Sequence, residues 1–229
     1  MLWNETAVRE NLRNREGKRV FYLKKGDQLT SGARDWLSRE RIGILPAQQA
    51  KEEAYRLING AVLPEKPEHM THLNGDVLVS KTHPRIAFRG KLDTLEAELI
   101  LCQLASPELV TPVGEILALS RRLIRCDVLD EPVTEEKLWG LTAEELRKRS
   151  HFPQDYYGQP HFAPSAGDGE VIARLNRSRC AAREAELAAV EAFSDREGNP
   201  TRVDILRCLN RISSAIYILM VQQKAEQRG

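Results

Sequence analysis

Two arginines near the C-terminus have the type and spacing of an anion-binding pair. Arg179 and Arg183 are four residues apart, so on a helix they lie one turn apart, and Glu186 follows on the same face. A guanidinium group presents a planar fork of donors that matches phosphate oxygens, and an acidic neighbour holds it in position. One interpretation of this spacing is therefore a polyanion site on this helix.

The helix that follows supplies candidate partners for these charges. Its apolar seam repeats at three- and four-residue intervals through Ile205, Leu209, Ile212, Ile216 and Leu219. A second seam includes Asn210 and Ser213, which would place an amide and a hydroxyl inside a bundle. Buried polar groups cost free energy unless they are hydrogen-bonded. Two interpretations are open: a structural polar network that fixes helix register, or a polyanion site.

The face that carries the arginines is otherwise apolar. Ile172, Val190 and Phe193 share it, so the three charged residues interrupt a stripe where a helical bundle usually places leucine.

Residues 81–103 carry another set of polar residues. From about Phe88 the spacing is helical, with an apolar stripe of Leu92, Leu95, Leu99 and Cys102. A polar row lies beside it, formed by Arg89, Asp93, Glu96 and Gln103. Such a helix is either the wall of a polar site or an ordinary surface helix with an intrahelical ion pair.

The elements that position these residues fall into three parts. Residues 1–60 predict a small α/β appendage: a strand over 20–23, a helix from Thr30 to Arg39, a strand over 42–45, and a polar helix over 47–58. Residues 61–70, with two prolines, predict a linker. Residues 71–229 predict a bundle of four to five helices, so the expected fold class is mainly α.

One segment of the predicted bundle is not helical in pattern. Residues 151–169 are expected to form a long loop rich in aromatic side chains, and such loops are commonly functional.

Composition excludes several functions. The net charge of +1 gives no electrostatic case for nucleic acid. No apolar run approaches the roughly 20 residues of a membrane span, and no signal peptide is evident, so we expect a cytoplasmic protein without a membrane partner. The cysteines, Cys102, Cys126, Cys180 and Cys208, are far apart and predict buried thiols, with no metal site.

Four segments together resemble the cobalamin adenosyltransferases of ethanolamine utilisation. They are KKGDQLTSGARDWLSRERIGIL near the N-terminus, THLNGDVLVSKTHPRIAFRGKLDTLEAELILCQ, the RxxxRExE pattern from Arg179 to Glu186, and CLNRISSAIYILM. The likeness covers nearly the whole chain, and a more distant one connects it to the propanediol-utilisation type.

The resemblance implies a helical-bundle enzyme whose substrates are ATP, with Mg²⁺, and cobalamin. Cob(I)alamin attacks the ribose 5′-carbon and expels triphosphate. It also implies a homo-oligomer with ATP at the subunit interface, and ethanolamine ammonia-lyase and a reductase as partners, in the cytoplasm or inside a bacterial microcompartment. Two alternatives are a non-catalytic corrinoid carrier and a compartment-associated bundle protein.

The resemblance also assigns residues. Lys81 matches the lysine of the nucleotide loop, and Asp93 matches an acid that pairs with an arginine at the subunit boundary. Arg179, Arg183 and Glu186 match the cluster around the nucleotide, and Asn210 matches the asparagine of the last helix. The expected catalytic residues are Arg183, Asp93 and Arg179; the expected ATP-binding residues are Lys81, Arg89, Arg179, Arg183, Glu186 and Asn210.

The related enzymes pack a bulky apolar side chain against the lower corrin face. Phe152, Tyr157 and Phe162 are the candidates here for cobalamin binding, with Phe162 favoured and Phe152 second, because a phenyl ring has no hydroxyl to ligate the metal. The alternative is that these rings pin the loop to the bundle.

The sequence departs from the family pattern in three places. Residues 46–70 contain no cysteine, so the metal motif of the ethanolamine-utilisation enzymes is absent; Ser214 stands where distant relatives have aspartate; and residues 82–90 lack their glycine-rich loop.

Because no cysteine precedes Cys102, we predict that activity does not depend on iron or zinc. Protein treated with a transition-metal chelator and resupplied with Mg²⁺ should keep its rate of adenosylcobalamin formation. A requirement for added Fe²⁺ or Zn²⁺ would contradict this prediction.

Overall fold

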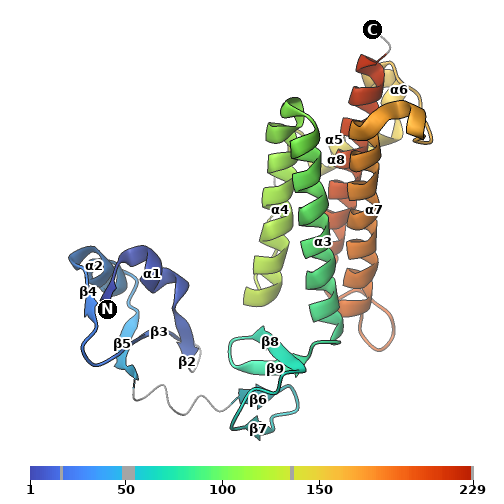
Figure 1. Cartoon of the computed structure of the whole chain (residues 1–229). Helices are drawn as coiled ribbons and strands as arrows, with labels where there is room; N and C mark the ends of the chain where they lie inside the picture. The colour runs from blue at the N-terminus through green and yellow to red at the C-terminus, as the bar shows by residue number, and fades with distance from the viewer. Residues whose placement is uncertain (16–17, 48–54, 135–136, 228–229) are drawn as a thin grey trace. The chain divides into compact units, whose positions relative to one another are not determined.

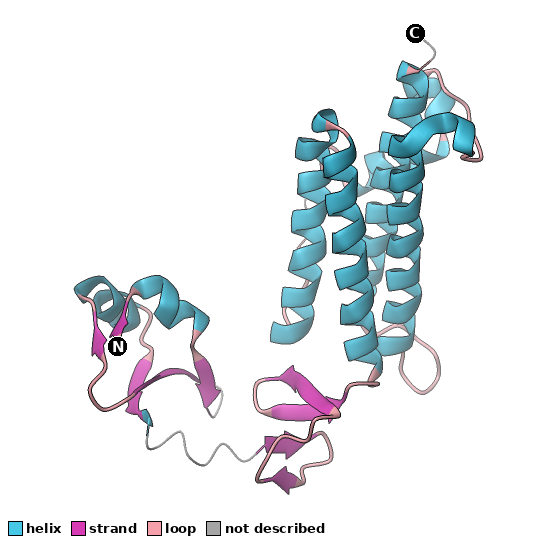
Figure 2. Ribbon diagram, viewed as in Figure 1, coloured by secondary structure: helices cyan, strands magenta, loops and turns pink. Residues whose placement is uncertain are grey.

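The computed structural model describes residues 1–15, 18–47, 55–134 and 137–227. By its internal contacts the chain divides into two compact units, Met1–Lys81 and Thr82–Gly229, and each is described by itself. Strands lie in the first unit and long helices in the second (Figure 2). The expected mainly α fold with a small N-terminal α/β region is confirmed.

The first strands and helices include the three elements expected from the sequence over 20–45, together with others that were not expected. They are β1 (Leu2–Trp3), α1 (Glu5–Glu10), β2 (Arg13–Arg15), β3 (Lys18–Leu23), β4 (Gln28–Leu29), α2 (Ser31–Arg39) and β5 (Gly43–Pro46). Thr30 caps α2 by accepting a hydrogen bond from the Ala33 amide at 3.2 Å. β3 pairs in parallel with β5, which confirms the strand–helix–strand unit. Phe21 and Leu37 are buried in its small core.

A four-stranded sheet follows, in the order β7-β6-β9-β8. Its strands are β6 (Tyr55–Leu57), β7 (Val62–Leu63), β8 (Met70–Asn74) and β9 (Val77–Ser80). The expected helix over 47–58 is wrong at 55–57, and residues 48–54 lie outside the described residues. Strand pairing overrides helix propensity here, because β6 pairs in parallel with β9; Arg56 also binds Asp76 beside β9 through two hydrogen bonds of 2.7 and 3.0 Å. The expected linker over 61–70 is likewise wrong at both ends.

The second unit is a bundle of long helices. Its elements are α3 (Pro84–Ala105), a 3₁₀ turn (Pro107–Leu109), α4 (Val110–Leu129), α5 (Ala143–His151), α6 (Pro153–Tyr157), a 3₁₀ turn (Ala166–Asp168), α7 (Gly169–Ala192) and α8 (Val203–Glu226). α3 packs along α4 and α7, α7 packs along α8, and α5 lies against α8 (Figure 1). The bundle begins at Pro84 rather than at 71, because residues 70–80 form the β8–β9 hairpin.

The core of the bundle confirms two predicted stripes and corrects a third. The α3 stripe and the first α8 seam are buried. On α7, however, the buried face is rich in alanine and does not include the arginines; it consists of Ile172, Leu175, Ser178, Ala181, Ala182, Ala185 and Ala189. Val190 is 43% exposed. Arg179, Arg183 and Glu186 therefore lie beside the core face, not within it, because small side chains form the contact with the neighbouring helices.

The polar row on α3 joins this helix to α4. Arg89 Nε lies 2.6 Å from Asp127 Oδ2, and Arg85 Nε lies 2.7 Å from Asp127 Oδ1. Arg85 also donates to the Asp127 carbonyl at 2.7 Å. The Asp127 side chain is fully buried. Neither interpretation from the sequence, a site wall or an intrahelical ion pair, describes this interhelical clamp.

Glu96 and Gln103, which belong to the same row, also bind residues of α4. Glu96 pairs with Arg121 at 2.9 Å, and the Gln103 amide donates to the Val110 carbonyl at 2.7 Å. Asp93 is exposed.

Two further expectations need correction. Residues 151–169 are not one long loop, because α6 and a 3₁₀ turn interrupt them and leave 158–165 irregular. The cysteines are not all buried: Cys102 and Cys126 are, whereas Cys180 is exposed and Cys208 is intermediate. None of the helices in the described ranges has the length and apolar character that a membrane span requires.

We predict that Asp127→Ala destabilises the bundle by about 3–5 kcal/mol, because it leaves two largely buried guanidinium groups without their carboxylate. Urea denaturation should show a lower midpoint with an unchanged slope. Glu170→Ala is the control: it removes an exposed i,i+4 pair with Arg174 and should cost less than about 0.5 kcal/mol. A wild-type midpoint for Asp127→Ala would show that the clamp contributes no stability.

Candidate functional site: an arginine-lined pocket beside the bundle core

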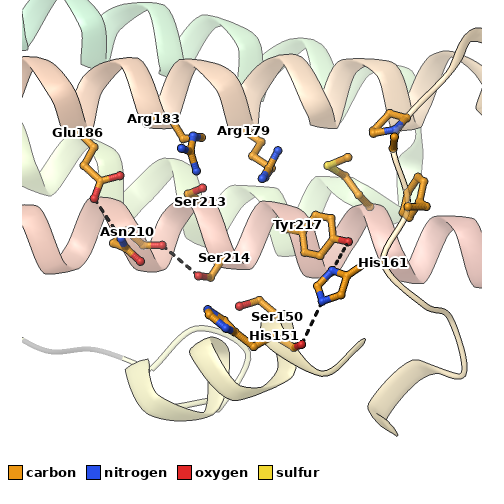
Figure 3. Close-up of a pocket in the computed structure, with 14 residues that line it drawn as sticks. Ser150, His151, His161, Arg179, Arg183, Glu186, Asn210, Ser213, Ser214 and Tyr217 are labelled. Carbon is orange, nitrogen blue, oxygen red and sulfur yellow. Dashed lines mark hydrogen bonds between the residues drawn. The ribbon is translucent and has the colours of Figure 1, made fainter. Parts of the chain in front are cut away.

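A pocket of about 690 Å³ opens on the second unit. Residues of α7 and α8 line it together with the end of α5 and residues 161–164 (Figure 3). Its lining is formed by Ser150, His151, His161, Phe162, Ala163, Pro164, Arg179, Arg183, Glu186, Asn210, Ser213, Ser214, Tyr217 and Met220. The volume falls within the range of about 300–1,000 Å³ typical of small-molecule sites.

Two guanidinium groups give the pocket its charge. Arg179 and Arg183 extend from successive turns of α7 toward α8 (Figure 3). Within the described part of the chain, no carboxylate forms an ion pair with either of them, although the neighbouring Arg177 binds both Glu98 and Glu184. Two guanidinium groups that face a pocket and are not engaged in an ion pair there favour an anionic ligand.

Arg179 does have a contact within the protein. Its guanidinium carbon lies 5.3 Å from the centroid of the Tyr217 ring, within cation–π distance. Tyr217 is in turn bonded to His161, with 2.8 Å between the hydroxyl and Nδ1. Burial raises the pKa of the Tyr217 phenol, so it remains protonated at neutral pH.

A second chain of hydrogen bonds holds the one carboxylate of the pocket. Glu186 Oε1 accepts from Asn210 Nδ2 at 3.0 Å, and Arg211 donates to Asn210 Oδ1. These two bonds fix which way the Asn210 amide points. The pKa of Arg211 is lowered, mainly by burial, and the Glu186 carboxylate offsets only part of this shift. Ser214 Oγ donates to the Asn210 carbonyl at 3.1 Å and so is partly engaged with the helix.

The structure brings together about half of the predicted site residues. Arg179, Arg183, Glu186, Asn210 and Phe162 all line this pocket. Asn210 and Ser213 face the opening and are not buried in the bundle, which corrects the expected second seam.

The other predicted site residues lie elsewhere. Lys81 belongs to the first unit, where it is 3.5 Å from Glu68; Arg89 is in the Asp127 clamp; and Asp93 is on the exposed surface of α3. Phe152 is 55% exposed and is not part of the lining, whereas Tyr157 packs against the bundle core.

His151, His161 and Tyr217 are among the pocket residues that sequence reasoning did not assign to the site. The heptad seam already placed Tyr217 on the helix face of Asn210 and Ser213, so that spacing was the available signal. His161 gave no such signal, because its position depends on the path of an irregular segment.

A model of the family described as cobalamin adenosyltransferase matches residues 62–223, which include the whole pocket. The chain belongs to this family. This confirms the family expected from the sequence motifs. In the described ranges of this adenosyltransferase-family chain, no three His, Cys, Asp or Glu side chains group together as a metal site would require.

Known members of the family are similar along most of the chain. A protein of Salmonella typhimurium named corrinoid adenosyltransferase EutT is 32% identical over 246 aligned residues, which cover 97% of this chain and 92% of the relative. A protein of the same name from Escherichia coli K12 is 35% identical over 164 residues, which cover 71% of this chain and 61% of the relative.

We predict that inorganic tripolyphosphate binds the pocket and stabilises the fold. At a tripolyphosphate concentration of one hundred times its dissociation constant, the free energy of unfolding should rise by about 2.7 kcal/mol. The measurement is the rise in melting temperature, compared with that in sulfate at equal ionic strength. The Arg179→Ala/Arg183→Ala double variant should lose this rise, and Arg177→Ala should keep it. Equal rises in all three proteins would place the anion elsewhere.

Proposed function

We propose that this chain transfers the adenosyl group of ATP to cob(I)alamin, giving adenosylcobalamin and triphosphate for ethanolamine utilisation. The proposal is carried by the two guanidinium groups of the pocket, which form no ion pair with a described carboxylate. This pocket lies within the residues that match the family model. The names of its relatives support the substrate class, because both are called corrinoid adenosyltransferases.

In this proposal Arg179 and Arg183 bind the triphosphate. The cobalt(I) electron pair forms the bond to the 5′-carbon while the bond from that carbon to the phosphate oxygen breaks, and its electrons leave with triphosphate. Negative charge on the leaving group grows during this step. Fixed cationic donors therefore stabilise the transition state more than the bound substrate, and this difference lowers the barrier.

The Glu186 carboxylate needs an explanation, because a negative charge beside a polyphosphate is repulsive. The hydrogen bond from Asn210 and the guanidinium group of Arg211 behind it offset that charge. We propose that this chain of three side chains keeps Glu186 at a fixed position, where it orients Arg183 once ATP has entered.

Several features of the proposal extend beyond this pocket. Mg²⁺ would be carried largely by the phosphate oxygens, since this ion is usually bound through substrate phosphates and only one or two carboxylates.

A homo-oligomer would give Asp93 and Lys81 a role at a neighbouring subunit. The large apolar side chains Leu104 and Leu187, 78% and 72% exposed, are candidates for its interface. Ethanolamine ammonia-lyase, a reductase and a microcompartment interior remain part of the same proposal.

The direct test is to incubate the protein with ATP, Mg²⁺ and chemically reduced cobalamin and to follow the absorbance of the cobalt–carbon product. Stoichiometric binding of cobalamin without product would support a corrinoid carrier instead.

We predict that Arg183→Ala lowers kcat/KM by about 10²–10³, the scale of one lost charge-stabilising donor. Arg174→Ala is the matched control on the same helix; its guanidinium pairs with Glu170 outside the pocket, so its kcat/KM should stay near wild type. Circular dichroism establishes that both variants fold. Near-normal turnover of folded Arg183→Ala would remove the arginine from the mechanism.

For the corrin, the structure favours Phe162 as the wedge, because it is the one of the three aromatic candidates that lines the pocket. We predict that Phe162→Ala binds ATP normally but reduces the four-coordinate cob(II)alamin signal in electron paramagnetic resonance, since removing an apolar side chain readmits an axial ligand. Phe152→Ala and Tyr157→Ala should affect the signal less. A signal that persists in all three variants would exclude this segment as the wedge.

A further inference from the structure

We propose that Tyr217 is a positioning residue that holds the Arg179 guanidinium for a polyphosphate ligand, and that His161 fixes the Tyr217 ring. The inference rests on the proposed function, because it takes the triphosphate of ATP as the ligand of Arg179. Neither Tyr217 nor His161 was expected from the sequence to take part in the site.

The first step is the contact between Arg179 and Tyr217. The guanidinium lies over the ring at 5.3 Å, and no described carboxylate pairs with it. A free arginine side chain has many rotamers, and ordering them on ligand binding costs free energy. An aromatic face limits the rotamers without neutralising the charge, so Arg179 keeps its full attraction for phosphate.

The second step is how the ring itself is held. His161 Nε2 lies 3.0 Å from the His151 carbonyl oxygen, which can only accept, so Nε2 carries the proton. In the neutral imidazole Nδ1 is then an acceptor for the Tyr217 hydroxyl at 2.8 Å. Figure 3 shows these two bonds in line, from the end of α5 through His161 to α8. The Tyr217 ring therefore has a fixed tilt toward Arg179.

The third step is the support of the segment that carries His161. The Phe162 ring stacks near Tyr217, with centroids 6.5 Å apart and planes at 25°. Farther along, Asp168 accepts from Lys224 and from the Ser165 amide, and these bonds hold the pKa of its carboxyl at about 2. The Asp168 carboxylate therefore remains charged at neutral pH. Residues 161–168 are bound to α8 at both ends, through His161 and through Asp168.

The chain offers a matched control. Arg149 lies over the Tyr156 ring at the same 5.3 Å, but neither residue lines the pocket. Tyr156→Leu thus removes an equivalent cation–π contact without touching the proposed site.

The test is a double-mutant cycle with inorganic tripolyphosphate as the probe, measured by titration calorimetry on the full chain. We expect Tyr217→Leu to weaken tripolyphosphate binding about tenfold, and Tyr217→Phe, which keeps the ring, to weaken it about threefold or less. In the Arg179→Met background, Tyr217→Leu should have no further effect, because the ring acts only through Arg179. Tyr156→Leu should bind as wild type.

The same variants should separate substrate binding from chemistry. Tyr217→Leu should raise the KM for ATP. Its kcat should fall only if the change also weakens the contact between Arg179 and the leaving triphosphate in the transition state. If Tyr217→Leu does not fold, His161→Ala replaces it, since His161 is exposed; it should weaken tripolyphosphate binding in the wild-type background and not in Arg179→Met.

The outcomes separate the two proposals. If Arg179→Met loses tripolyphosphate affinity and the Tyr217 and His161 effects are additive with it, the positioning role is wrong and the proposed function stands. If wild-type protein binds neither tripolyphosphate nor ATP, the proposed function fails and this inference with it.

Discussion

The close approach of α7 to its neighbours is the constraint on which the site depends. Alanines at 181, 182, 185 and 189 form much of the buried face of this helix, so its own side chains there are small and its backbone lies near α3 and α8. This packing sets the rotation of α7. Arg179, Arg183 and Glu186 are consequently turned to the flank, where α8 and the end of α5 complete a pocket around them.

That rotation also determines the charge balance. On the opposite flank of α7, Arg177 and Glu184 join Lys91 and Glu98 in exposed ion pairs that contribute little stability each. On the pocket flank Arg179 and Arg183 form no ion pair with any described carboxylate, although Glu186 lines the same pocket, and Arg179 lies over the Tyr217 ring. The difference in ion pairing between the two flanks leaves the pocket flank as the more favourable place for the anion that we propose binds there.

The Asp127 clamp has a different role from the pocket arginines, although the residue types are the same. Arg85 and Arg89 are largely buried and share one buried carboxylate, so they join α3 to α4 at the start of the bundle. The arginines that share a buried carboxylate thus join two helices, whereas the pocket arginines, which form no ion pair with a described carboxylate, are the ones that we propose bind the anion.

The sequence by itself determined the family, the mainly α fold class and the helices with strong periodicity. The Thr30 cap and the stripe from Leu92 to Cys102 are local signals, because each depends on contacts within a few residues or on a single helical face. The spacing of Arg179 and Arg183 allowed an anion site as one of two interpretations, and the structure places both residues in one pocket.

Only the tertiary structure decided which polar residues share a site. Arg89 was expected among the ATP-binding residues, but its partner, Asp127, is 38 residues away. Tyr55–Leu57 became a strand because a partner strand was available at 77–78. His161 and Tyr217 meet across 56 residues through an irregular segment. Sequence periodicity reports the face of a helix but not the neighbour that the face meets, since that neighbour depends on how the whole chain packs.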